Sequence, residues 1–357
     1  MSVSKFEQGK KWLVGLCYGL TFMIVLALVN APAVQSYIYT LKNPHVETAT
    51  SVVLDSQAMG DTDSQDAGDK GRQHAGDRTD PLLKEIEALA RTINEQPVNA
   101  RIDRVWKAIP GYNGIEVDVA KSYELAKQTG KVRLEHLVIN EVEPEVSLDD
   151  LPPAAIYRGN PKKPMVAFMV NVAWGTEYVP QMLDIFDDYQ VRATFFLDGK
   201  WLSRNIEVAQ EIVTRGHEIG NHAYSHPDMR RLSITEIHEE ISKTEQLIQE
   251  LGVRSRYFAP PAGAYDNRVV KVARELNMHT VMWTLDTVDW KKPAPSEIRA
   301  RIVPYLENGS LILMHPTAPT VEALPSLIEG ALQKELQAGS VAQVLSPERT
   351  IAIVRVE

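Results

Sequence analysis

Three histidines in the second half of the chain, His222, His226 and His315, are the residues best suited to chemistry. Histidine and carboxylate side chains are the groups that most often transfer protons or bind divalent metals. His222 and His315 each follow a short apolar run that is typical of a buried strand, and Asp198 and Asp289 follow two others. We therefore expect these side chains to converge at one end of a sheet.

The elements that would position these residues alternate between strands and helices from residue 164 onward. One helix is predicted to begin at Ser233, because Glu236 three residues later completes a capping box. Strands with intervening helices predict a parallel sheet, open or closed into a barrel, whose chemistry lies at the carboxyl ends of the strands. The expected strands cover residues 165–172, 192–197, 218–220, 256–259, 280–285, 311–314 and 341–345.

Five short motifs in this region carry a family resemblance. They are ATFFLDG (193–199), GHEIGNHAYSH (216–226), FAPPAG (258–263), TLDTVDW (284–290) and LILMHP (311–316). In type and order they resemble the motifs of the polysaccharide deacetylase family, the NodB homology domain of carbohydrate esterase family 4. The resemblance implies an α/β fold, a distorted (β/α)7 barrel. It also implies a hydrolase of carbon–nitrogen bonds that removes N-acetyl groups from glycans such as peptidoglycan or chitin.

The resemblance also implies a role for each side chain at the strand ends. His222 and His226 form an H-x-x-x-H motif and are the expected ligands of a divalent metal such as zinc, which activates a water in the family. His315 is the expected general acid, and Asp289 is expected to orient it. The expected substrate-binding positions are Trp290, Trp174 and the backbone N–H of Ala262, which takes the place of the oxyanion donor.

The first motif of the family is altered in this sequence. The family's T-F-D-D-G corresponds to residues 171–175, so Ala173 takes the place of the base and Trp174 that of the metal-binding aspartate. The arginine that pairs with the base is missing from segment 258–263 as well. A buried arginine without its aspartate would destabilise the protein by roughly 3–5 kcal/mol. The joint loss therefore indicates a remodelled site.

Three interpretations of this site stay open. The first is a working hydrolase with altered metal ligation, because two histidines alone make a poor zinc site; Asp198 is the best replacement ligand and Glu177 another. The second is an inactive glycan-binding protein that uses Trp174, Trp290 and Tyr265 as faces for sugar rings. The third is an envelope protein that docks other proteins.

The N-terminal region predicts export or membrane attachment. Residues 12–29 carry no charge and follow three lysines, which predicts a transmembrane anchor whose N-terminus lies inside the cell. A signal peptide cleaved after Ala33 is the alternative for residues 1–34. A flexible acidic linker is expected at residues 35–78.

A small α+β module is expected at residues 79–150, ahead of the deacetylase-like domain at 160–357. Asp80 and Pro81 predict the start of a helix. Residues 115–119 and 132–138 alternate like strands, with a helical segment between them.

Composition limits the partners. The net charge of −9, from 38 Lys and Arg against 47 Asp and Glu, argues against nucleic acid. The single cysteine, Cys17, excludes an intramolecular disulfide. The expected partners are a cell-wall glycan and, through the N-terminal segment, a membrane. The arrangement of membrane segment, spacer and module resembles a sporulation-associated branch of the family, which implies a place outside the cytoplasm of a Gram-positive bacterium.

Overall fold

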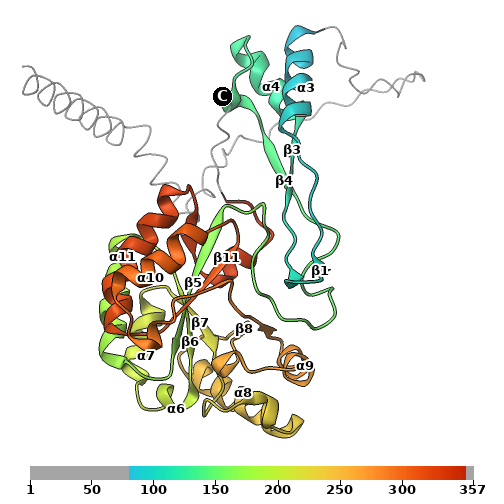
Figure 1. Cartoon of the computed structure of the whole chain (residues 1–357). Coiled ribbons are helices and arrows are strands. Elements are labelled where there is room, and N and C mark those ends of the chain that lie inside the picture. The colour runs from blue at the N-terminus through green and yellow to red at the C-terminus, as the bar shows by residue number, and fades with distance from the viewer. Residues whose placement is uncertain (1–79, 351–357) are drawn as a thin grey trace, which may run out of the picture. The chain divides into compact units, whose positions relative to one another are not determined.

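The computed structural model describes residues 80–350, and most of them form a curled parallel sheet surrounded by helices (Figure 1). The sheet has eight strands in the order β10-β11-β5-β6-β7-β8-β9, with β12 paired to β5 beside this path. This arrangement confirms the α/β class and the distorted (β/α) barrel. The strands are β5 (Met165–Val172), β6 (Thr194–Leu197), β7 (Glu218–Asn221), β8 (Tyr257–Phe258), β9 (His279–Thr280), β10 (Leu285–Asp286), β11 (Ser310–Met314) and β12 (Gln337–Gly339).

Strand β5 shows how the core forms on both faces of the sheet. All eight of its residues are buried. Successive side chains of a strand point to opposite faces, so Phe168 and Val170 pack among the helices while Met169 packs inside the barrel against Phe196. A strand that is covered on both sides needs the continuous apolar run that the sequence has here. The larger helices are α5 (Val179–Asp188), α7 (Ile206–Thr214), α8 (Ile234–Glu250), α9 (Asn267–Glu275), α10 (Pro295–Ile302) and α11 (Ala318–Gln333).

Most strand predictions for the barrel are confirmed, but two of them differ from the structure. The strand expected at 280–285 is instead two short strands, β9 and β10. The four residues between them do not form a regular strand. The strand expected at 341–345 is wrong, because these residues form helix α12 (Val341–Leu345). The Ser340 hydroxyl accepts from the backbone N–H of Gln343, and the Gln343 side chain accepts from the backbone N–H of Ser340. This capping box starts a helix within a five-residue apolar run that suits either element.

The module before the barrel combines two helices with two antiparallel strand pairs. The helices are α3 (Pro81–Ile93) and α4 (Val119–Thr129); β1 (Arg101–Asp103) pairs with β2 (Lys107–Ile109), and β3 (Gly114–Val117) pairs with β4 (Ile139–Val142). The predicted start of α3 is confirmed, since an Asp80 carboxylate oxygen accepts from the Leu82 N–H at 2.8 Å. The strand expected at 132–138 is wrong, because this segment contains a 3-10 turn and pairing begins only at Ile139.

The predictions for residues 1–34 and 35–78 lie outside the described residues. Within residues 80–350, the structure contains no helix that is long and apolar enough to cross a membrane.

Candidate functional site

A pocket of about 410 Å³ opens at the carboxyl ends of the strands, and the structure brings most of the predicted site residues to it. His222 directly follows β7, His315 directly follows β11, and His226 lies on the loop after β7. Asp289 lies behind the pocket wall and is fully buried. The other predicted positions that line the pocket are Trp174, Ala262 and Trp290, together with Ala173.

His222 and His226 form a pair of neutral imidazoles. Their ring centroids are 5.2 Å apart. His222 Nδ1 donates to the carbonyl oxygen of Ala259 at 2.7 Å, so its Nε2 keeps a free lone pair. Burial and the neighbouring His226 lower the pKa of His222 to about 3, and burial also lowers the pKa of His226. Both rings are therefore uncharged at neutral pH and can accept hydrogen bonds.

Asp289 holds His315 in one orientation. The Asp289 carboxylate accepts from His315 Nδ1 at 2.8 Å and from the His315 backbone N–H at 2.6 Å. It also accepts from the Thr320 hydroxyl at 2.6 Å. Because the carboxylate fixes Nδ1 as the donor, Nε2 of the neutral His315 ring is unprotonated. In this tautomer Nε2 can take up a proton and later donate it.

Trp174 covers one face of His315. The two rings are stacked, with centroids 5.8 Å apart and planes inclined by 8°. The indole nevertheless stays 45 % exposed, and Trp290 nearby is 54 % exposed. Gly175 makes this approach possible: its φ is +76°, and a Cβ there would lie 2.1 Å from the Pro316 carbonyl oxygen. Residues 173 and 174 thus contribute a methyl group and an indole, and neither is a carboxylate.

The sequence is similar to those of known proteins. A sequence profile of the polysaccharide deacetylase family matches residues 158–281. The chain is 49 % identical over 273 residues to an uncharacterized protein of Bacillus subtilis, YlxY, across 76 % of this chain and 86 % of that protein. It is 33 % identical over 181 residues to a peptidoglycan-N-acetylglucosamine deacetylase of Bacillus cereus, across 49 % of this chain and 66 % of that enzyme.

The solved structures narrow the assignment. A CE4 family pseudoenzyme from Bacillus anthracis is 43 % identical to this chain with a TM-score of 0.71, across 76 % of this chain and 97 % of that protein. The chain belongs to carbohydrate esterase family 4. A mutant of the same pseudoenzyme, described as having restored enzymatic activity, matches with the same TM-score at 42 % identity over its full length.

The metal centre implied for family 4 does not fit the residues present. Within residues 80–350, no three His, Cys, Asp or Glu side chains lie close enough together to hold a metal. Asn171 and Asp286 also line the pocket; the buried amide oxygen of Asn171 has no hydrogen-bond partner among the described residues. The two histidines alone give fewer than the three protein ligands that hold a catalytic zinc.

Neither replacement ligand considered for the family 4 centre joins the histidine pair. Asp198 is buried and caps helix α6 (Gly199–Leu202), where one carboxylate oxygen accepts from the Trp201 N–H at 2.8 Å. Its other oxygen is buried without a partner, and burial raises the pKa of this carboxyl to about 6. Glu177 belongs to a 3-10 turn after β5 and does not line the pocket. Asp198 therefore caps helix α6, and within residues 80–350 it belongs to no cluster of three potential metal ligands.

Backbone strain surrounds the pocket. Ala223, His226, Ala262 and Val288 all have φ between 52° and 60°, in the left-handed region that residues with a Cβ rarely adopt. Such strain is concentrated at functional sites in proteins. At Ala262 the strained turn leaves a backbone N–H at the pocket that forms no hydrogen bond with another described residue. This N–H lies at the residue to which the family resemblance assigns the oxyanion donor, and that role stays a prediction.

Four contributors were not predicted. Trp283, Leu313 and Asp286 line the pocket, and Thr320 supports Asp289 from the first turn of α11. Leu313 could have been found from the strand alternation, because it lies two residues before His315 on the same face. Thr320 had no local signal, since its partner is 31 residues away in the sequence.

Proposed function

We propose that the protein binds an N-acetylated cell-wall glycan and does not hydrolyse it. The observation that carries this proposal is the Trp174 ring stacked on His315 at the pocket, in the position where the family has its metal-binding aspartate. This side chain adds an apolar face and removes a metal ligand. The glycan class is supported by the names of related proteins, which include peptidoglycan deacetylases.

Binding has a physical basis in the two exposed indoles. Trp174 and Trp290 present flat apolar surfaces at the same pocket, and the C–H faces of sugar rings pack on such surfaces. The same pocket offers unused polar groups, since His222 has a free lone pair and the Asn171 oxygen has no partner among the described residues. They suit the hydroxyl and amide groups of an uncharged N-acetyl sugar, because buried polar groups require hydrogen-bond partners.

The pocket lacks the carboxylate that serves as the base in the family. A general base must reach the attacking water, but residue 173 is alanine and no alternative carboxylate has joined the histidines. His315 and Asp289 keep the geometry of the acid half, which is the observation that favours a working hydrolase as the second candidate.

We also propose where the protein lies in the cell. Residues 12–29 anchor the chain in a membrane, and the linker at 35–78 holds the binding domain outside the cytoplasm of a Gram-positive bacterium. A role in sporulation belongs to the same proposal and rests on the resemblance in domain arrangement alone.

Calorimetric titration of the protein with chitin oligomers tests this function. We expect saturable binding that Trp290→Ala weakens about tenfold, as the loss of an aromatic contact of about 1.4 kcal/mol would produce. Tyr305→Ala is the matched control, because Tyr305 is 63 % exposed but does not line the pocket. Acetate release that disappears in His315→Ala would favour the hydrolase, and the absence of any glycan binding would favour a docking protein.

A further inference from the structure

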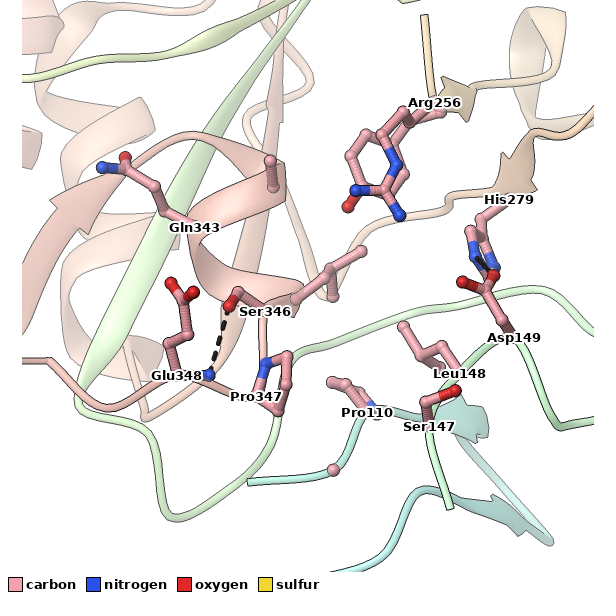
Figure 2. Close-up of a pocket in the computed structure, with 14 residues that line it drawn as sticks. Pro110, Ser147, Leu148, Asp149, Arg256, His279, Gln343, Ser346, Pro347 and Glu348 are labelled. Carbon is pink, nitrogen blue, oxygen red and sulfur yellow. Dashed lines mark hydrogen bonds and ion pairs between the residues drawn. The ribbon is translucent and has the colours of Figure 1, made fainter. Parts of the chain in front are cut away.

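A second groove, of about 390 Å³, lies at the opposite end of the barrel from the glycan pocket (Figure 2). Its residues come from the start of β8 and β9, from α12 and the segment after it, and from the chain that links the module to the barrel. These are the amino ends of the strands, whereas the histidines follow the carboxyl ends. The volume falls within the roughly 300–1,000 Å³ that is usual for small-molecule sites.

Tyr257 presents its hydroxyl to this groove. The residue as a whole is only 5 % exposed, and its hydroxyl forms no hydrogen bond with any residue in the described part of the chain. The hydroxyl oxygen itself is not sealed in the core but is open to the groove. Burial of the ring raises the pKa of Tyr257 above its ordinary value, so the hydroxyl stays protonated. It is therefore available to donate to a ligand in the groove.

Arg256 adds an exposed guanidinium next to this donor. Within residues 80–350 it forms no ion pair or hydrogen bond at contact distance, although it lines the groove and the charge of Glu218 acts on it. On the same wall, one oxygen of Asp149 accepts from His279 Nε2 at 2.8 Å and from Arg274 at 3.3 Å. His279 Nδ1 accepts from Arg274 in turn, at 3.0 Å, so the imidazole is neutral and this wall is fixed.

Glu348 places the opposite charge on the other side. Figure 2 shows Arg256 and His279 on one side of the groove and Gln343 and Glu348 on the other. The Glu348 carboxylate has no hydrogen bond or ion pair within the described residues; only its backbone N–H is used, donating to Ser346. Between the two sides the lining is apolar, with Leu148, Leu345 and Pro110. The groove thus carries a cation with a donor at one side and an anion at the other.

We infer that this groove binds a short peptide or amino acid that carries both a free carboxylate and an ammonium group. The ligand's carboxylate pairs with the Arg256 guanidinium, which can bind it through two parallel hydrogen bonds, and accepts from the Tyr257 hydroxyl. Its ammonium group pairs with Glu348, and its apolar part covers Leu148 and Leu345. This function is separate from glycan binding, because the two sites share no residue.

Calorimetric titration of the full-length protein with dialanine tests the inference, with N-acetyl-dialanine and dialanine amide as probes that lack one charge each. We expect dialanine to bind and Arg256→Gln to weaken it about tenfold, as hydrogen bonds to a charged group predict. Tyr257→Phe, which keeps the ring in the core, should weaken binding about threefold. Glu348→Gln should weaken the binding of dialanine but leave the affinity for N-acetyl-dialanine unchanged.

Arg254→Gln is the matched control, because Arg254 lies two residues away, is exposed and does not line this groove. It should change dialanine affinity less than about twofold, as expected for an exposed charge outside the site. Trp290→Ala should leave dialanine binding unchanged, which separates this inference from the proposed glycan function. Any one of three results would overturn the inference. The first is that the folded protein binds no dialanine at 10 mM, which is roughly the weakest affinity that a specific site of this kind would have. The others are that Arg256→Gln binds dialanine as well as the unaltered protein does, or that all three probes bind equally.

Discussion

The two halves of the glycan pocket differ in how completely their polar groups are satisfied. On one side, Asp289 is fully buried and accepts three hydrogen bonds, two from His315 and one from Thr320. On the other side, Ala173 and Trp174 carry no acid at all, and Trp174 is packed against His315. A decayed site would leave unpaired charges, which destabilise a protein. The contrast therefore indicates that one half was rebuilt around aromatic packing while the other was preserved.

Restoring the acids of the changed half is the change with the largest expected effect. In Ala173→Asp/Trp174→Asp the histidine pair gains a carboxylate ligand, the pocket gains a base, and His315 is uncovered. We expect stoichiometric zinc binding by elemental analysis and acetate release from chitin oligomers at least about a hundredfold above that of the unaltered protein, the range of general base catalysis.

The control for that experiment is Ala173→Asn/Trp174→Asn, which has similar volume without the charges. If the asparagine variant released acetate equally well, the contrast between the two halves would not lie in the lost carboxylates.

Breaking the preserved half should have the next largest effect, on folding. Asp289→Ala leaves the two His315 donors and the Thr320 hydroxyl without their acceptor. We expect the free energy of unfolding to fall by about 3 kcal/mol in urea titrations, as for other buried hydrogen-bond networks. Asp286→Ala is the matched control, three residues earlier at the end of β10; Asp286 is half-buried and accepts from the Val288 N–H alone. A loss no larger than the control's would mean that the network does not stabilise the fold.

Substitution of Asp198 should have a smaller effect on stability, and this effect depends on pH. Asp198 lies beside the changed half, because its backbone N–H donates to the Val172 carbonyl. Burial raises its pKa from 3.8 to about 6, so the folded state binds this proton more tightly than the unfolded state. The resulting stabilisation is complete below pH 4 and is lost as the pH rises through 6. Asp198→Asn keeps the cap on α6 and removes the charge.

The asparagine variant should therefore be more stable than the unaltered protein by about 2 kcal/mol at pH 8 and equal to it near pH 4. Paired urea titrations at the two pH values measure this difference and cancel the contributions of the histidines. An equal difference at both pH values would show that the carboxyl is not perturbed.

Motifs and apolar runs predicted much of this molecule. The run at 165–172 predicted the central strand because a strand buried on both faces must be apolar throughout. Four site residues could be located because each lies at or soon after the end of a predicted strand: His222, His226, His315 and Asp289. The run at 341–345 failed, since five apolar residues suit a short helix as well as a strand, and the deciding signal was the Ser340 and Gln343 spacing.

Contacts between distant segments could not be predicted. The stacking of Trp174 on His315 joins residues that are 141 positions apart in the sequence (315 − 174). It depends on the pairing of β11 with β5. Asp198 follows a strand as a ligand would, but its carboxylate turns back to the Trp201 N–H. Whether a carboxylate points into a pocket or caps the next helix depends on the backbone after the strand, which the residue type does not specify.

The most direct test of the account follows both the glycan and its acetyl group in one sample. Full-length protein is incubated with zinc and a chitin oligomer labelled on its acetyl groups, and the label retained on the protein and the label released as acetate are both counted. We predict label that is retained on the protein in saturable fashion, with release no greater than in buffer. Release above buffer that His315→Ala abolishes would contradict the account and identify a working deacetylase.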